Sequence, residues 1–444
     1  MTWQNEYRSK LKTPEEAVRV VKSGDWVDVA TVVCFPTLLD RALARRRDEL
    51  TDVKVRGNLI FGPIEMVECD PTREHFTYNS WHCSAYERKL VDRGLCSYIP
   101  MVFRNIIPYY RNYLTLNVAM IAVSPMDRHG YFHFSCGTGV GRGLVEAADY
   151  VILEVNEHLP VILGGFDECV HISEVDCVVE GEHPPLPQFP LTEPSAEDIA
   201  IADQIVPLIP NGACLQLGIG AMPNVVGARL AQSDLKDLGM HTELCSDAYY
   251  ELYKAGKLTN RANSIHRGKG YSGIFFGSQE LYDWVTENPG VAAAPLEYIN
   301  APETIGQMDN MISINNCIAV DLYGQVCAES AGLRHISGTG GQLDYLTGAF
   351  MSRGGKGFIC MTSSFVDKTG RRRSRILPHF GGDIVTDPRS QAFYLVTEQG
   401  VVNLAGRSTW ERAEMLVSIA HPDFREELIA AAESQKIWRQ SNKR

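Results

Sequence analysis

Short apolar runs alternate along the chain with longer stretches in which apolar residues recur every three or four positions. The apolar runs are of strand length and often rich in β-branched residues, and they include residues 26–33, 118–123, 150–155 and 213–217. The helical pattern occurs between and after them, at residues 13–22, 196–206 and 410–419. Apolar strands joined by helical crossovers are typical of a parallel sheet that is covered on both faces. The pattern therefore predicts an α/β fold.

A proline-rich segment interrupts this alternation, with five prolines in twelve consecutive residues. That density is incompatible with a helix or a central strand, so we predict an extended linker over residues 184–194. The linker separates an N-terminal domain, residues 1–183, from a C-terminal domain, residues 195–444. Ser195 can cap the next helix, and Asp198 falls in the first turn of that helix, where a negative charge is favourable.

The two halves begin alike. Residues 23–43 and residues 211–230 both read as a turn, an apolar strand, a loop with proline and an amphipathic helix. This parallel indicates a duplicated α/β domain. Such a pair usually places its site in the cleft between the domains, where loops at strand ends converge. We predict two similar open α/β domains, with mostly parallel sheets covered by helices and the active site in the interdomain cleft.

The charge balance disfavours nucleic acid and membrane as partners. The 444 residues include 42 Lys and Arg against 54 Asp and Glu, which leaves a net charge of −12. A chain this acidic repels phosphate backbones and anionic lipid unless its basic residues are concentrated. The longest apolar runs are far shorter than a membrane span, and the first ten residues lack the apolar stretch of a signal peptide. We expect a cytoplasmic protein.

Twelve cysteines raise the question of a metal site or disulfides. No CxxC pair occurs, and most of the cysteines lie in apolar surroundings, as Cys34 and Cys214 do, where a thiol behaves as a small hydrophobic group. His129 and His133 are four residues apart, but Gly130 between them disfavours a helix carrying both, and no third ligand is near in sequence. We predict reduced, structural cysteines and no metal site.

A glycine loop follows the run at 213–217 and opens a helix. It consists of Gly218, Ile219, Gly220, Ala221 and Met222. Glycines let backbone amides approach an anion or a carbonyl oxygen, and the helix N-terminus adds a favourable dipole. Proline stands where a dinucleotide fingerprint needs its third glycine, and no GK[ST] follows. Alone, the loop is either a ligand-binding loop or a tight strand-to-helix turn.

Glu243 follows this loop by about twenty residues, in a segment with His241, Thr242 and Ser246. A single glutamate is usually a solvated charge or an ion-pair partner. The glycine loop changes that interpretation, because it would present amides to the group that Glu243 attacks. His241 is better explained as a hydrogen-bonding neighbour than as a base.

Three further segments carry polar residues or glycines. Residues 337–357 contain seven glycines around a helical patch, which suggests backbone wrapped closely around a ligand. Arg371, Arg372 and Arg373 follow a turn sequence, so they favour a solvated hairpin turn, with contact to a nucleotide's phosphates as the alternative. In the first half, residues 124–135 and 154–156 are polar breaks at the ends of apolar runs and are candidates to line the cleft.

Together these segments resemble the class I CoA-transferases of the acetyl-CoA hydrolase/transferase family. The resemblance covers essentially the whole chain and rests on motifs in a fixed order. These motifs are GIGAMPN at 218–224, GMHTELCSDA at 239–248, SINNC at 313–317, SGTGGQLDYLTGA at 337–349 and SIAHPDFREEL at 418–428. Further segments resemble the members that act on butyryl-CoA and acetate, and they are NSWH at 79–82, YERKLVDRG at 86–94 and the IWRQSN ending. The chain is also similar to members that use 4-hydroxybutyrate.

The resemblance implies an enzyme that moves CoA between butyryl-CoA and acetate by ping-pong steps through a glutamyl-CoA thioester. A 4-hydroxybutyrate CoA-transferase and an acyl-CoA hydrolase are the alternatives. Glu243 would be the nucleophile, residues 218–222 and Gly341 would bind CoA and supply oxyanion amides, and Asn300 would lie near the reactive thioester. CoA would be a co-substrate, and we expect a homo-oligomer. Many relatives have glycine where this chain has Ala248, which refines the substrate and leaves the chemistry intact.

The physical chemistry agrees with these roles. A carboxylate is ionised at neutral pH, so it attacks a thioester without the help of a general base. The chain therefore needs no Ser-His-Asp arrangement.

Overall fold

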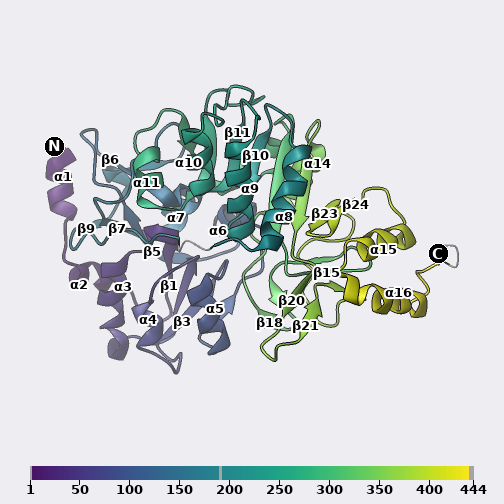
Figure 1. The fold of residues 1–444 in the computed structure, drawn as a ribbon. Helices are drawn as coiled ribbons and strands as arrows, with labels where there is room; N and C mark the ends of the chain where they lie inside the picture. Colours follow the sequence, from purple (N-terminus) through teal and green to yellow (C-terminus); the bar gives the residue numbers. More distant parts are fainter. Residues whose placement is uncertain (1–2, 190–192, 440–444) are drawn as a thin grey trace. The chain divides into compact units, whose positions relative to one another are not determined.

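The computed structural model describes residues 3–189 and 193–439. The chain divides into two compact units (Figure 1). The first unit comprises Met1–Pro190, Thr242–Asp247 and Lys269–Ala301, and the second comprises Leu191–His241, Ala248–Gly268 and Pro302–Arg444. Two segments from the middle of the sequence therefore belong with the N-terminal residues.

The N-terminal sheet has seven strands, and all of its pairings are parallel. Its order is β4 (Cys96–Tyr98), β3 (Phe76–Ser80), β2 (Val53–Asn58), β1 (Trp26–Thr31), β5 (Leu116–Val123), β7 (Ala148–Val155) and β9 (Cys177–Val179). The helices along this part of the chain are α1 (Trp3–Lys10), α2 (Pro14–Ala17), α3 (Thr37–Ala44), α4 (Glu65–Glu68), α5 (Ala85–Asp92), α6 (Ile106–Asn112) and α7 (Thr138–Ala147). β6 (Tyr131–His133) and β8 (Cys169–His171) form a separate antiparallel pair. Apolar side chains of the strands and of α2 to α5 form a common core.

A second sheet of eight strands follows. Its order is β13 (Val291–Ala293), β12 (Gly270–Phe275), β11 (Gly239–Cys245), β10 (Cys214–Leu217), β14 (Met311–Asn316), β19 (Lys356–Cys360), β23 (Tyr394–Thr397) and β24 (Gly400–Asn403). Helices along this part are α8 (Ala196–Ile205), α9 (Ala221–Gln232), α10 (Asp247–Lys254), α11 (Gln279–Val285), α12 (Leu296–Ile299), α13 (Pro302–Ile305) and α14 (Gln342–Met351). β11 itself passes from the second unit into the first at Thr242.

The two sheets share one strand order. In the first, the chain starts in the middle at β1, adds β2 to β4 on one side, and then returns to add β5, β7 and β9 on the other. The second repeats this scheme, with β10 and β14 in the places of β1 and β5, and ends on an antiparallel β23–β24 pair. Ligands of open α/β sheets bind where the strand order reverses, outside the carboxyl ends of the strands. The predicted class, two similar open α/β domains with mostly parallel sheets, is confirmed.

The predicted elements agree with those observed, with two differences in length. The four apolar runs form β1, β5, β7 and β10, and the helical patterns form α8 and α15 (Thr409–Ser418). Ser195 caps α8 together with Asp198, as expected. β1 ends two residues early, because Val32 takes a left-handed φ of 54°. The helix expected at 13–22 is only α2 followed by a 3-10 turn at Val18–Val20.

The proline-rich segment is extended where it is described. Residues 184–189 form no helix or strand, and Pro190, Leu191 and Thr192 lie outside the described residues. Within the first unit, Asn156 donates a hydrogen bond to the Pro184 carbonyl oxygen at 2.9 Å. The domain limits at 183 and 195 stay a prediction.

Small β-structures and two helices extend the second unit. Three short strands form one sheet in the order β16 (Val326–Cys327), β15 (Ala319–Asp321) and β22 (Ile376–Leu377). Two hairpins accompany it, β17 (Ser330–Ala331) with β18 (Arg334–His335) and β20 (Ser364–Val366) with β21 (Arg372–Ser374). α15 packs against α16 (Arg425–Ser434), and both are drawn in yellow in Figure 1. Among the helices of the described residues, none is long and apolar enough for a bilayer crossing.

No disulfide joins any of the twelve cysteines, all of which lie in the described residues, and nine of them are buried. Burial raises the pKa of Cys34 and of Cys214 to about 12. These side chains therefore behave as part of the apolar core, as the sequence predicts.

Candidate functional site

Glu243 and Asn300 meet in the first unit although 57 residues separate them in sequence. The Asn300 side-chain amide donates a hydrogen bond from Nδ2 to Glu243 Oε2 at 2.6 Å. Glu243 is half-buried, whereas Asn300 is fully buried. A buried amide that donates to a carboxylate fixes the orientation of that carboxylate.

The backbone on both sides of this pair is held by regular structure. Glu243 lies in the second half of β11, where the Ser272 hydroxyl of β12 donates to its carbonyl oxygen at 3.2 Å. Two residues later, the Phe276 amide donates to the Cys245 carbonyl oxygen at 3.1 Å. Asn300 ends the short helix α12, and its own backbone amide donates to Leu296 and Tyr298. Both side chains therefore project from anchored backbone.

The glycine loop lies in the second unit, between β10 and α9. Gly220 has a φ of 117°, which side-chain-bearing residues rarely adopt, and it precedes α9 with no side-chain cap. Ile219 and Gly220 are exposed. The first amides of a helix have no intrahelical partner, so the amides of Ala221 and Met222 are available to a bound acceptor.

A buried polar network supports this loop from β14. Asn315 and Gln216 exchange hydrogen bonds at 2.9 and 3.0 Å, and the Ser313 hydroxyl donates to Gln216 Oε1 at 2.7 Å. A Cβ on Gly218 would stand 3.0 Å from Asn315 Oδ1, closer than a side chain tolerates without movement. Gly218 therefore has a packing reason to be glycine, and Gly220 a conformational one. The start of the loop is held by β14 itself, because the Gly218 amide donates to the Ile314 carbonyl oxygen at 2.8 Å.

Gly341 is also in the second unit, directly before α14. It is buried, and α14 begins after it with no side-chain cap. The loop before it is tied down by Thr339, whose hydroxyl donates to Glu329 Oε2 at 2.9 Å. Gln342, the first residue of α14, donates to Asp387 Oδ2 at 2.7 Å. Of the three glycines predicted to bind CoA, Gly220 and Gly341 therefore each directly precede a helix.

Ala248 lies beside a glycine of α9. A Cβ on Gly227 of α9 would stand 2.6 Å from the Ala248 Cβ, so glycine on α9 leaves room for the alanine. His241 is fully buried, with its ring centroid 6.4 Å from that of Tyr345. The expectation that His241 is a hydrogen-bonding neighbour and not a base stays a prediction.

A small cavity lies at the carboxyl ends of the N-terminal strands. Its volume is about 160 Å³. The side chains and backbone that line it come from the ends of β1, β2, β5 and β7 and from the proline-rich segment, and they include Val32, Val33, Phe61, Gly62, Ala122, Glu154, Asn156 and Pro184–Pro187. Phe61 also stacks on Phe276 at 4.2 Å between ring centroids. The Phe276 backbone amide also donates to Cys245, in the strand that carries Glu243. The contact between Phe61 and Phe276 therefore links this cavity to that strand.

The sequence predicted that polar residues at strand ends line a cleft, but it did not identify most of the residues that line this cavity. Glu154 and Asn156 of the segment 154–156 do line it, whereas its lining includes no residue of 124–135: Phe132 is buried in the core and Tyr131 packs against His171. The missed residues, Val32 and Phe61, sit in apolar sequence that looks like ordinary core. Val32 has a left-handed φ of 54°, and no sequence signal marks it.

Across the described part of the chain, no three His, Cys, Asp or Glu side chains form a group that would hold a metal ion. The first unit offers a carboxylate with an amide donor, and the second unit offers backbone amides at helix starts. A carboxylate held by an amide suits nucleophilic attack on an activated carbonyl group, and uncapped helix amides suit the oxyanion that results.

Comparison with known proteins decides the family. Residues 1–190 match the acetyl-CoA hydrolase/transferase N-terminal domain, and residues 277–432 match the C-terminal domain of the same name. Over 446 aligned residues the chain is 49% identical to the butyryl-CoA:acetate CoA-transferase of Anaerostipes caccae, with 100% of both chains covered. The chain belongs to the acetyl-CoA hydrolase/transferase family.

Two other relatives support this assignment to the acetyl-CoA hydrolase/transferase family. The 4-hydroxybutyrate coenzyme A transferase of Clostridium kluyveri is 38% identical, over 97% of this chain and 98% of that one. The crystal structure of RipA from Yersinia pestis superimposes with a TM-score of 0.91 at 35% identity, over 98% of this chain and 100% of that one. This member of the acetyl-CoA hydrolase/transferase family is a CoA-transferase, with CoA as its co-substrate.

Proposed function

We propose that this CoA-transferase moves CoA between butyryl-CoA and acetate through a thioester on Glu243. The observation that carries the proposal is the hydrogen bond from Asn300 Nδ2 to Glu243 Oε2, at 2.6 Å in the first unit. It orients a half-buried carboxylate at a strand end in a family of CoA-transferases. Similarity to a butyryl-CoA:acetate CoA-transferase along the whole chain supports the substrates.

The first half-reaction is an exchange at two carbonyl carbons. A Glu243 oxygen attacks the butyryl carbonyl carbon, the C–S bond breaks, and a butyryl-glutamyl anhydride forms with release of CoA thiolate. The thiolate then attacks the glutamyl carbonyl carbon, the anhydride C–O bond breaks, and butyrate leaves. Glu243 now holds CoA as a thioester, and no proton has been transferred.

The second half-reaction runs these steps in reverse with acetate. The acetate carboxylate attacks the glutamyl-CoA carbonyl carbon, and CoA thiolate departs. The thiolate attacks the acetyl carbonyl carbon of the new anhydride, which gives acetyl-CoA and restores the Glu243 carboxylate. Because one carboxylate serves both halves, butyrate must leave before acetate reacts.

Each attack passes through a tetrahedral oxyanion, and the proposed roles of the other residues follow from this. In the glutamyl-CoA thioester, Asn300 would donate to the glutamyl carbonyl oxygen, where negative charge grows. The amides of residues 218–222 and of Gly341 would bind CoA and meet the oxyanion of the acyl group. Donors fixed in this way by helix starts need no reorganisation during the reaction.

The cavity of about 160 Å³ at the N-terminal strand ends is the proposed acyl site. Its walls include Val32 and Phe61, which suit a hydrocarbon chain, and its size suits a short one. A preference by chain length should be graded, because each methylene contributes only ~0.8 kcal/mol on burial.

The decisive experiment is incubation of the protein with butyryl-CoA, with and without acetate, while acetyl-CoA and free CoA are followed. We expect acetyl-CoA to form only with acetate, and free CoA to stay low in both arms. Free CoA released at the same rate without acetate would instead show a hydrolase. Faster turnover with 4-hydroxybutyryl-CoA than with butyryl-CoA would assign the enzyme to that substrate.

Covalent capture tests the intermediate itself. Borohydride added after butyryl-CoA should reduce the thioester and change the mass of the peptide that contains Glu243. Initial rates against acetate at several butyryl-CoA concentrations should give parallel double-reciprocal lines. Intersecting lines, or an unmodified peptide under turnover conditions, would contradict the mechanism.

A further inference from the structure

Strand β1 of the first unit contains one more residue than the strand beside it. β1 pairs with β2 at Asp28 and Arg56 and again at Thr31 and Asn58, so three steps along β1 match two steps along β2. Such a β-bulge bends its strand and redirects a side chain, and it is rare in parallel pairs. Bulges gather at sheet edges and beside active sites. Because β1 is the middle strand of seven, the position of this bulge points to a site.

The backbone is left-handed in the bulge and directly after it. Ala30 has a φ of 59° and Val32 one of 54°, in a region that residues with a side chain seldom adopt. For a β-branched residue such as Val32, this conformation is an outlier. Strained backbone of this kind persists only where the surrounding structure fixes it. The bulge therefore needs support from other groups.

A buried carboxylate of β1 supplies that support. Asp28 is 3% exposed, and its Oδ1 accepts a hydrogen bond from the backbone amide of Ala30 at 2.7 Å. Its Oδ2 accepts a hydrogen bond from the hydroxyl of Tyr110, which lies on α6. A carboxylate that bonds to the amide two residues further on forms an Asx turn, a local bend that competes with regular strand pairing. Asp28 therefore bends β1 at Ala30, and Tyr110 holds Asp28 in place.

The surroundings of Asp28 keep its carboxylate charged at neutral pH. Burial raises the pKa of Asp28 to about 6. Its two hydrogen-bond donors and the charge of Arg56 oppose that rise. Arg56 is itself buried, and it donates to the Thr115 carbonyl oxygen at 2.9 Å. Hydrogen bonds to an ionised acceptor are roughly twice as strong as those to a neutral one, so the support of the bulge is firm.

The bent end of β1 forms part of the wall of the proposed acyl site. Val32 and Val33 follow the bulge directly and line the cavity of about 160 Å³, whereas Asp28 does not line it. Side chains alternate between the two faces of a strand, so one extra residue changes the face that the following side chains take. Asp28 therefore acts on the wall of the cavity through the backbone of β1.

We propose that Asp28, supported by Tyr110, is a positioning residue that sets the acyl-chain preference of the enzyme by holding the bulge of β1. The inference rests on the proposed function, because it takes the small N-terminal cavity as the acyl site. The hydrogen bond from Ala30 keeps the bulge, the bulge places Val32 and Val33 in the wall, and the wall limits the length of chain that fits.

The test compares two donors that differ by two methylenes. A mixture of butyryl-CoA and hexanoyl-CoA is incubated with acetate, and the ratio of the two kcat/KM values is obtained from the acids released. Asp28→Ala removes both hydrogen bonds, whereas Asp28→Asn keeps an oxygen for the Ala30 amide. We expect Asp28→Ala to lower the preference for butyryl-CoA by ~4-fold or more, the effect of one methylene, and Asp28→Asn to retain most of it.

Ala30→Gly provides a rescue. Glycine adopts a positive φ readily, so it needs no carboxylate to hold the bulge. In the double variant Asp28→Ala/Ala30→Gly, the preference for butyryl-CoA should return toward that of the wild type. Asp25→Ala is the matched control, because the Asp25 carboxylate also accepts a backbone amide, that of Lys22 at 2.8 Å, but lies before β1. Its ratio should equal that of the wild type.

Two outcomes would overturn the inference. Equal losses of kcat/KM on both donors in Asp28→Ala would show that Asp28 supports the fold alone. A changed ratio that Ala30→Gly does not restore would show that Asp28 acts by a route other than the bulge. If Asp28→Ala does not fold, Tyr110→Phe replaces it, since this variant loses only a hydroxyl. It should change the ratio in the same direction by less, and an unchanged ratio would again count against the inference.

Thermal unfolding separates this inference from the proposed function. Without substrate, Asp28→Ala should lower Tm, and it should lower Tm by less when the protein already carries Ala30→Gly, because both residues act on one conformation. A wild type that moves no CoA from butyryl-CoA to acetate would refute the proposed function, and this coupling would still decide whether Asp28 holds the bulge. Equal losses of Tm in the two backgrounds would refute the inference while transfer continued.

Discussion

Two glutamates of the first unit occupy similar positions in parallel strands and have opposite surroundings. Glu154 of β7 is 3% exposed, and its carboxylate accepts hydrogen bonds from the backbone amides of Leu38 and Leu39 at 3.0 Å. Glu243 of β11 is half-buried, and the Asn300 side chain donates to it at 2.6 Å. A carboxylate at a strand end is therefore not by itself a nucleophile: the difference lies in access and in which group orients it.

The helix start explains the role of Glu154. α3 begins at Thr37, and its first amides need acceptors. The Glu154 carboxylate supplies them, and burial raises its pKa to about 7. Its position in the wall of the small N-terminal cavity gives that cavity a polar end. Glu154 thus fixes structure around the proposed acyl site, whereas Glu243 is the proposed nucleophile.

The largest effect should come from removing the proposed nucleophile. Glu243→Ala should lower kcat by ~10⁴-fold or more, because no other group can form the thioester. Glu243→Asp, one methylene shorter, should leave only a trace. Glu154→Gln should keep most of the activity. Transfer assays on the three variants check this, and an active Glu243→Ala beside an inactive Glu154→Gln would reverse the comparison.

Removing the orienting amide should have the next largest effect. Asn300→Ala should lower kcat ~10²–10³-fold, as the loss of one oxyanion donor does, with a much smaller change in KM. Asn300→Asp should be at least as damaging, since it places a second negative charge beside Glu243. Steady-state kinetics with circular dichroism as a folding control would show this. If KM rose while kcat stayed constant, Asn300 would bind substrate without acting on the reacting carboxylate.

The protonation of Glu154 should contribute to the pH dependence of the free energy of unfolding. Its pKa is raised to about 7 by burial, so the folded state binds its proton more tightly than the unfolded state does. The stability contributed by this proton is fully present below the unfolded pKa of ~4.3 and is lost as the pH rises through 7. Glu154→Gln, which carries no charge, should therefore flatten the fall of Tm between pH 5 and pH 8.

The matched control for this measurement is Glu157→Gln, an exposed position three residues further on. Its Tm profile should follow the wild type. Part of the slope should remain in Glu154→Gln, because burial also raises the pKa of Asp40 to about 7. Identical profiles for the wild type and Glu154→Gln would show that Glu154 stays ionised in the folded protein.

The smallest effect is expected on the preference of the enzyme for one acyl-chain length over another. Gly62 lines the small cavity, and a Cβ there would meet nothing within 4 Å, so Gly62→Val should narrow the cavity without straining the fold. Loss of room for one methylene, worth ~0.8 kcal/mol, corresponds to ~4-fold in kcat/KM for butyryl-CoA relative to acetyl-CoA. Gly381→Val is the control, since the space at Gly381 is also open. An unchanged ratio would place the acyl chain elsewhere.

The sequence alone determined the local architecture and the place of the glycine loop. Apolar runs gave β1, β5, β7 and β10, because strands buried on both faces need such runs. Ser195 with Asp198 marked a helix start by a capping interaction that acts over three residues. Asp367, which accepts the amides of Thr369 and Arg371, marked the β20–β21 turn in the same way. These interactions are short-range, so the order of residues is enough to predict them.

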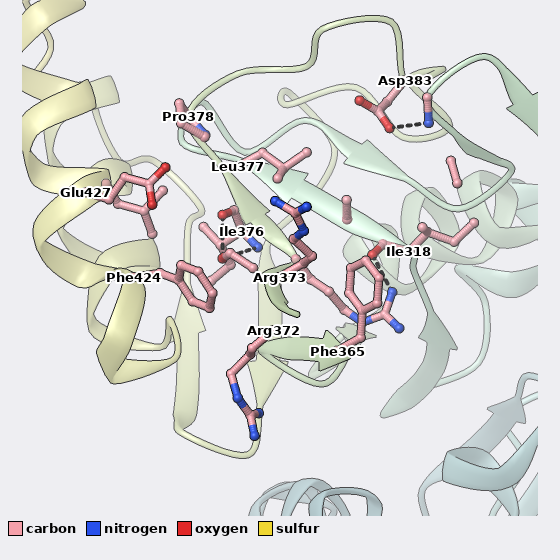
Figure 2. A pocket seen from close by; sticks show the side chains of 16 residues that line it. Ile318, Phe365, Arg372, Arg373, Ile376, Leu377, Pro378, Asp383, Phe424 and Glu427 are labelled. Atoms are coloured by element: carbon pink, nitrogen blue, oxygen red, sulfur yellow. Dashed lines mark hydrogen bonds between the residues drawn. The ribbon is translucent and has the colours of Figure 1, made fainter. Parts of the chain in front are cut away.

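The resemblance to a family singled out Glu243 and Asn300, but only the tertiary structure joined them. A hydrogen bond across 57 residues depends on how β11 and α12 are positioned, and no periodicity encodes that. The left-handed Val32, the burial of Glu154 and the fit of Ala248 against Gly227 likewise result from packing between distant segments. The run of arginines at 371–373 shows the same limit. The sequence places these residues on a turn, and only the packing of β15, β22 and α16 decides that Arg372 and Arg373 line a cavity of about 390 Å³ (Figure 2) while Arg371 does not.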